Sequence, residues 1–347
     1  MQNENELFEA LKAKLHPIYT EGELRHKAGL AAQINQLKKE KNAIILGHNY
    51  MEPVLFHSIP DVTGDSLALS RQAAETDADI IVFCGVEFMA ETAKILNPSK
   101  KVIIPSQKAG CSLAESITAE DIRLLRKKFP GVPIVAYVNT YADVKAEVDI
   151  CCTSGNAKAV VESLDTDTII FLPDQYLAQN VANETGKRII FPRREGDQVI
   201  LPKEPKDYDF VGWHGKCEVH EKYTVADINT IREQYPEVVI LTHPESSPEV
   251  VAASDYSGST SGMIKYVAET DAPQYLLLTE CAMGDNIAAE HREKEFLRLC
   301  MVRCPHMNTI TLEDTLKALQ REQYEVHVPE NVRLRAVRSV ERMIAIG

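Results

Sequence analysis

The sequence predicts an α/β fold made of three pseudo-symmetric, three-layer αβα domains, each built on a small parallel sheet. From residue 41 onward, short apolar runs alternate with helical stretches, which is typical of parallel sheets flanked by helices. The same order of strands, polar turns and helices recurs three times along the chain. Each repeat ends at a cysteine, which is Cys111, Cys217 or Cys304.

The repeats set the expected domain boundaries. We expect a helical segment, three repeat domains and a second helical segment over 1–40, 41–112, 113–218, 219–304 and 305–347. The interval from the first polar strand end to the cysteine is nearly equal in the first and third repeats. The second interval is longer by about the length of the polar segment 193–209, which we interpret as an insertion.

The charge balance limits the class of partner. The 347 residues carry a net charge of −13, so no basic field exists to attract nucleic acid or an acidic membrane. A small anionic substrate must therefore be held by local donors. The amino terminus has no apolar signal region and no run reaches membrane-spanning length, so we expect a cytoplasmic protein.

The cysteines are expected to be reduced in that compartment. Metal-binding or catalytic roles are then more plausible for them than structural disulfides. For Cys84, Cys151 and Cys152 we expect the simpler role of small buried hydrophobic residues.

Polar pairs follow the first strand of each repeat. The pairs are His48 and Tyr50, Tyr137 and Asn139, and His243 and Glu245. Side chains two residues apart on an extended chain point the same way, and α/β sheets bind ligands at the carboxyl ends of their strands. Histidine and glutamate can transfer protons near neutral pH, whereas each residue taken singly is more often a structural hydrogen-bonding group.

A polar turn opens the next helix in each repeat. These turns contain Ser66, Ser154 and Thr260, and free N–H groups at a helix start can receive anions. Simple capping of the helix by the hydroxyl groups is the alternative, and the two roles can coexist.

Equivalent cysteines around a pseudo-threefold axis would form one ring of thiolates. Cys111, Cys217 and Cys304 could hold zinc with an open position, or an iron–sulfur cluster that lacks its fourth protein ligand. An iron left open could act as a Lewis acid. Three unrelated buried cysteines are the alternative.

The ordered motifs from about residue 40 to the carboxyl terminus resemble one family, quinolinate synthase. They include GHNY, GDSLALSR, GCSLAE, YVNT, CTSGNA, KCEVH, THPES, GSTSGM and CPHM. The resemblance implies three α/β domains around a [4Fe–4S] cluster bound by Cys111, Cys217 and Cys304. It also implies condensation of iminoaspartate with dihydroxyacetone phosphate, with loss of phosphate and water, in de novo NAD biosynthesis.

The resemblance further implies residue roles and a source of substrate. Tyr50 and Glu245 would lead the acid/base chemistry, assisted by His48, His243 and Tyr137. Carboxylates and phosphate would be bound by His48, Ser66, Tyr137, Asn139, Ser154, His243, Glu245 and Thr260. Iminoaspartate would be handed over by an L-aspartate oxidase or dehydrogenase.

Two other functions fit three cysteines. One is a zinc hydrolase or aldolase-like enzyme, and the other is a non-catalytic iron–sulfur redox sensor. A sensor has no need of the acid/base pairs, which argues against it. The spacing of Cys300 and Cys304 motivates the hypothesis of a redox switch between them. Lys94 is expected to be solvated or ion-paired rather than a Schiff-base lysine.

Overall fold

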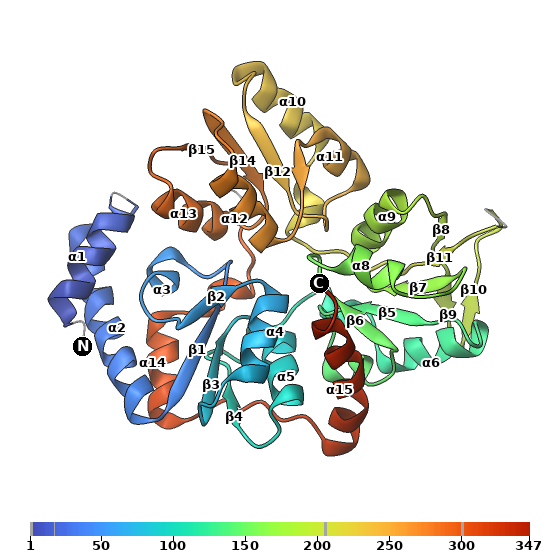
Figure 1. Ribbon diagram of the computed structural model, residues 1–347, viewed down its shortest axis with the longest axis horizontal. Coiled ribbons are helices and arrows are strands. Elements are labelled where there is room, and N and C mark those ends of the chain that lie inside the picture. The colour runs from blue at the N-terminus through green and yellow to red at the C-terminus, as the bar shows by residue number, and fades with distance from the viewer. Residues whose placement is uncertain (1–2, 17, 205–206, 300–301) are drawn as a thin grey trace. The chain divides into compact units, whose positions relative to one another are not determined.

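The computed structural model of the protein describes residues 3–16, 18–204, 207–299 and 302–347 (Figure 1). The chain divides into two compact units. Unit 1 comprises Met1–Gly110, Glu237–Val239 and Ile264–His327, and unit 2 comprises Cys111–Pro236, Ile240–Met263 and Val328–Gly347. The boundaries of the three repeat domains stay a prediction. Within the described ranges, no helix has the length and apolar character needed to cross a membrane.

Unit 1 opens with the two expected helices and continues into the first sheet. Its elements before residue 110 are α1 Glu4–Leu15, α2 Glu21–Glu40, β1 Ala43–His48, α3 Pro53–Phe56, β2 Val62–Gly64, α4 Ser66–Glu75, β3 Ile80–Cys84, α5 Glu87–Leu96 and β4 Lys101–Ile103. Its later elements are β14 Gln274–Leu278, α13 Cys281–Glu290, β15 Glu295–Leu297, η3 Met307–Thr309 and α14 Leu312–Arg321. Pro17, the expected break between the first helices, lies outside the described residues.

The first sheet of unit 1 has the strand order β2-β1-β3-β4, and its strands pair in parallel. Figure 1 shows α2 and α14 on one face of this sheet and α4 and α5 on the other. Because helices cover both faces, every residue of β3 is buried, which explains its continuous apolar sequence.

Unit 2 contains the second sheet, which has five strands. Its elements are η1 Ala114–Ser116, α6 Ala119–Lys128, β5 Ile134–Tyr137, α7 Ala142–Lys145, β6 Ile150–Cys152, α8 Ala157–Glu162, β7 Ile169–Leu172, α9 Gln175–Glu184, β8 Ile189–Ile190, β9 Arg193–Glu195, β10 Gln198–Ile200, β11 Phe210–Val211, η2 His220–Lys222, α10 Val225–Gln234, α11 Pro248–Ala253, β13 Tyr256–Ser257 and α15 Glu330–Ile344. The sheet order is β6-β5-β7-β11-β8, again with parallel pairs.

The third repeat contributes to both units through β12 Val239–Thr242 and α12 Thr260–Glu269. β12 pairs in parallel with β13, as β1 does with β2 and β5 with β6. In each repeat, a backbone N–H of the first strand also donates a hydrogen bond to the carboxylate of the aspartate just before the second strand. The pairs are Ile45 with Asp61 at 2.8 Å, Ile134 with Asp149 at 2.8 Å, and Ile240 with Asp255 at 2.7 Å. The expected α/β class, with small parallel sheets flanked by helices, is confirmed.

The first part of the segment interpreted as an insertion, residues 193–200, forms an antiparallel hairpin of β9 and β10. Arg194 ties it to α6, because its guanidinium lies 2.7 Å from Asp121 and 3.1 Å from Glu120. The hairpin is thus fixed to a helix of unit 2.

Several simpler predictions are confirmed. Cys84, Cys151 and Cys152 are fully buried, and burial raises the pKa of each thiol. Lys94 donates to the carbonyl of Lys100 at 2.7 Å and pairs with Glu325 at 3.4 Å.

Candidate active site

The Glu245 carboxylate is the centre of a buried polar cluster in unit 2. Its Oε2 atom lies 2.7 Å from His220 Nδ1 and 3.6 Å from His243 Nδ1, and its Oε1 atom accepts a hydrogen bond from Asn139 at 3.2 Å. The two imidazole rings stack with centroids 4.6 Å apart. Glu245 is 3% exposed and His220 is 1% exposed, so these contacts are shielded from water.

The cluster favours the ionised form of Glu245. Burial alone would raise its pKa, but His243 and His220 outweigh burial and, with a hydrogen bond from Tyr137, hold the pKa well below its usual range. The carboxylate is therefore an anion at neutral pH and can accept a proton without first losing one.

Ser154 extends the cluster toward a cavity. Its hydroxyl lies 3.2 Å from His243 Nε2, on the far side of the ring from Glu245. A cavity of about 270 Å³ begins there, with Ser154, Lys158, Pro244 and Ser259 among its lining residues. The polar residues just before α8 and α12, together with Lys158, thus border the cavity, which begins next to His243.

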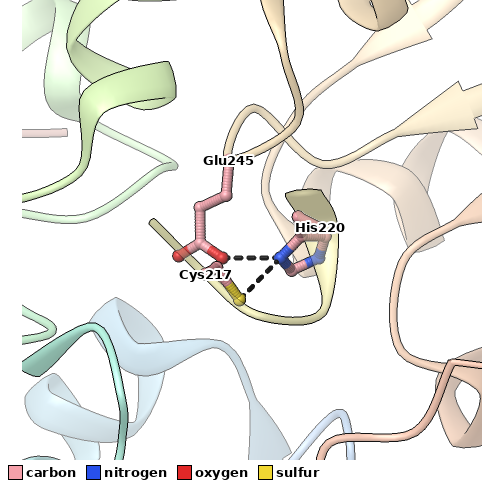
Figure 2. Close-up of side chains that lie close together, drawn as sticks. All are labelled: Cys217, His220 and Glu245. Atoms are coloured by element: carbon pink, nitrogen blue, oxygen red, sulfur yellow. Dashed lines mark hydrogen bonds and ion pairs between the residues drawn. The ribbon is translucent and has the colours of Figure 1, made fainter. Parts of the chain in front are cut away.

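The Cys217 thiol adjoins the same cluster, with its sulfur 3.1 Å from His220 Nδ1 (Figure 2). Burial raises the pKa of Cys217, and the nearby charges of Glu245 and Cys111 raise it further. Cys111 and Cys217 are therefore neighbours within unit 2, and neither forms a disulfide.

Two hydrogen bonds join the segments that carry these cysteines. Ser112 donates to Glu218 at 2.9 Å, and the Trp213 indole N–H donates to the carbonyl of Ser116 at 3.1 Å. Gly215 packs closely against Ser116, since a Cβ added to Gly215 would lie 2.4 Å from Ser116 Oγ. This packing fixes both cysteine segments together.

In unit 1, the polar pair His48 and Tyr50 at the end of β1 is also held in place by neighbouring side chains. The Tyr50 hydroxyl lies 2.6 Å from Thr279 Oγ1, and its ring packs edge-on against His48 with centroids 4.8 Å apart. The Asn286 amide donates to the carbonyls of Asn49 at 3.1 Å and Met51 at 2.9 Å. The end of β14 and helix α13 therefore set the position of Tyr50.

The three cysteines occupy the same local structure. The first residue of the helix after each third strand donates its N–H to the carbonyl just before the cysteine segment. The pairs are Glu87 to Ala109 at 2.7 Å, Gln175 to Gly215 at 2.7 Å, and Cys281 to Val302 at 3.3 Å. Each cysteine carbonyl then accepts a turn hydrogen bond, from Glu115 at 3.0 Å, Glu221 at 3.0 Å and Asn308 at 3.1 Å. Their equivalence thus rests on recurring geometry as well as on order in the sequence.

A threonine cap follows every cysteine at the same spacing. Thr118, Thr224 and Thr311 cap α6, α10 and α14, and an aspartate occupies the third helical position each time. This recurring cysteine, threonine and aspartate pattern is visible in the sequence and would have strengthened the repeat assignment.

The sequence-predicted residues fall in both units. Unit 2 brings together Tyr137, Asn139, Ser154, His243, Glu245, Cys111 and Cys217, and it contains Thr260, which is buried at the start of α12. Unit 1 contains His48, Tyr50, Ser66 and Cys304. Ser66 is the first residue of α4, whose cap is Asp65. Cys300 lies outside the described residues, so the Cys300–Cys304 switch stays a hypothesis.

Sequence reasoning missed three polar residues of these clusters. His220 follows Cys217 in a turn rather than a strand, and Thr279 follows β14. Asp174 is fully buried and caps α9 by accepting from the Leu177 N–H at 2.6 Å. Burial, and then the charge of Glu245, raise the pKa of Asp174 well above its usual range.

The fold and these buried clusters of ionisable groups are those of an α/β enzyme. The family described as Quinolinate synthetase A protein matches residues 32–345. The chain is 52% identical over 319 residues to Quinolinate synthase 2 of Mesorhizobium japonicum, which spans 92% of both chains. It is 51% identical to Quinolinate synthase of Xylella fastidiosa over 90% of this chain and 86% of that one. It is 48% identical to Quinolinate synthase of Caulobacter vibrioides over 96% of this chain and 85% of that one. The chain therefore belongs to the quinolinate synthase family.

Proposed function

We propose that this enzyme condenses iminoaspartate with dihydroxyacetone phosphate to form quinolinate in de novo NAD biosynthesis, releasing phosphate and two waters. The observation that carries the proposal is the position of Glu245. It is a buried, ionised carboxylate in contact with His220, which in turn contacts Cys217. A proton acceptor and a metal-binding thiol thus belong to one group of contacting side chains.

The residues present fit an iron–sulfur cluster. Two neighbouring thiols that form no disulfide, Cys111 and Cys217, lie in unit 2, and Cys304 has the same local structure in unit 1. We assign these three cysteines as the ligands of a [4Fe–4S] cluster. When bound, a cluster with three protein ligands supplies an open iron that serves as a Lewis acid toward a substrate hydroxyl.

In this proposal the chain supplies proton transfer. The ionised Glu245 accepts a proton from a carbon next to a carbonyl, and the Tyr50 hydroxyl donates a proton. His243 is stacked on His220 and joined to Ser154, so it is held in place to assist at the cavity. His48 and Tyr137 assist at the ends of the other two strands.

Both substrates are anions, whereas the chain has a net charge of −13. We assign their carboxylates and phosphate to local donors, which are Ser66, Asn139, Ser154 and Thr260 together with the histidines and Tyr137. Ser66 and Thr260 begin helices, where free N–H groups favour anions. We further propose that iminoaspartate arrives from an L-aspartate oxidase or dehydrogenase and that the reaction takes place in the cytoplasm.

The test is product formation. Protein prepared anaerobically and incubated with both substrates should release quinolinate and phosphate in equal amounts. A colourless, zinc-containing preparation that makes no quinolinate would favour the three-cysteine zinc enzyme.

Tyr50→Phe should retain its metal and lose turnover. The substitution removes only the hydroxyl, and Tyr50 is not a cluster ligand in our assignment. We expect kcat to fall by about 10²–10⁴-fold, the range for loss of one acid/base group. Iron content and steady-state rates measured on the same sample check this, and an unchanged kcat would remove Tyr50 from the acid/base set.

Thr279 should act as a positioning residue for Tyr50, because their hydroxyl oxygens are 2.6 Å apart. Thr279→Val removes the hydroxyl at nearly constant volume, and Thr279→Ser keeps it. We expect valine to lower kcat by about tenfold or more and serine to restore most of the activity. NMR of ring-labelled tyrosine should show a shifted Tyr50 signal in the valine variant alone. Equal behaviour of the two variants would exclude this role.

A further inference from the structure

Cys217, His220 and Glu245 form a compact set of three different donor atoms in unit 2. The sulfur, the imidazole nitrogen and a carboxylate oxygen all lie within 4.8 Å of one another. Figure 2 shows the three groups converging, with dashed lines joining His220 Nδ1 to the Cys217 sulfur and to the Glu245 carboxylate. Mixed nitrogen, sulfur and oxygen donors of this kind suit zinc and similar divalent transition metals rather than Mg²⁺ or Ca²⁺.

His220 Nδ1 contacts both of the other two donor atoms. The atom lies 3.1 Å from the sulfur and 2.7 Å from Glu245 Oε2, but an imidazole nitrogen carries at most one hydrogen. A metal ion at this point would engage all three donors at once. Metal binding would displace the thiol proton of Cys217, and the ion would offset the repulsion between the resulting thiolate and the carboxylate.

The three side chains are held before any metal arrives. His220 lies in η2 directly after the Cys217 turn, and its ring stacks on His243 at 4.6 Å. Asn139 fixes the other oxygen of Glu245 at 3.2 Å. A tetrahedral zinc ion would place nitrogen and sulfur ligands about 3.6 Å apart, so His220 Nδ1 and the Cys217 sulfur, 3.1 Å apart here, need to separate by only about half an ångström.

We propose that the cluster-free chain binds one divalent transition metal ion of the zinc type through Cys217 Sγ, His220 Nδ1 and Glu245 Oε2. The fourth position is left to water or Cys111. The site is built from unit 2 residues and does not depend on the proposed reaction. Because Cys217 cannot ligate this ion and a cluster together, the bound ion competes with cluster assembly.

Cobalt(II) is a suitable probe, because tetrahedral cobalt with a thiolate ligand absorbs strongly in the visible. The full chain, freed of metal and kept reduced without oxygen, should bind one cobalt per chain with that spectrum, and one equivalent of zinc should abolish it. His220→Gln should weaken cobalt binding by about tenfold or more. The matched control His214→Gln changes an exposed histidine of the same segment and should bind as the original chain does.

Two further variants separate the outcomes. Cys304→Ala cannot assemble the three-cysteine cluster but should keep the cobalt spectrum. Glu245→Gln should also weaken cobalt binding, while its far-UV circular dichroism stays unchanged. It therefore tests the site through a second ligand if His220→Gln fails to fold. The proposal is overturned if His220→Gln binds cobalt as tightly as the original chain, or if Cys304→Ala abolishes binding. Either result would place cobalt on the cysteines alone and leave the proposed cluster intact.

Discussion

Cys217→Ala should abolish both the iron and the formation of quinolinate. The Cys217 sulfur contacts His220 and lies near Glu245 and Cys111. Alanine supplies no ligand, and two cysteines do not retain a cluster that requires three. Iron and sulfide analysis of anaerobically prepared protein, together with a quinolinate assay, measures the effect.

The matched control is Cys152→Ala. Cys152 is fully buried in β6 and is not among the assigned ligands, so its loss should cost about 1–3 kcal/mol of stability and leave the iron in place. If Cys217→Ala retains full iron and activity, the cluster assignment is wrong, although membership of the family is unaffected.

Glu245→Gln should retain iron and lower kcat by about 10²–10⁴-fold. Glutamine has the same shape but cannot take up a proton as a carboxylate does. Because the histidines hold the pKa of Glu245 well below its usual range, the native carboxylate stays ionised as the pH falls from 8 to 5. If kcat falls as the pH is lowered from 8 to 5, the fall should therefore reflect protonation of a group other than Glu245.

The control for this variant is Glu221→Gln, which alters an exposed carboxylate on η2. It should have the activity of the original enzyme, because no part of the acid/base proposal involves it. A Glu245→Gln enzyme with normal kcat would contradict the proton-acceptor role. Loss of iron in that variant would instead indicate a structural role beside Cys217.

Much of the fold could be predicted because its strands are covered on both faces. β3, β5 and β7 are continuous apolar runs, and their burial explains why they were recognisable. The polar pairs at the strand ends were predictable for the same reason, since a change from apolar to polar residues marks the carboxyl end of a buried strand.

The missed residues lie where periodicity gives no information. His220 occupies a short 3₁₀ turn, and its contact with Glu245 joins distant parts of the chain. Thr279 follows a strand, but only the packing of unit 1 brings its hydroxyl to Tyr50. The burial that raises the pKa of Asp174 is likewise a property of the folded unit and not of the local sequence.

The central claim is that quinolinate formation depends on a cluster held by Cys111, Cys217 and Cys304. The most direct measurement titrates iron and sulfide into cluster-free protein under anaerobic conditions and records quinolinate formation at each step. We predict that activity rises in proportion to cluster content and reaches its plateau at about four irons per chain. Full quinolinate formation by cluster-free protein would contradict the account.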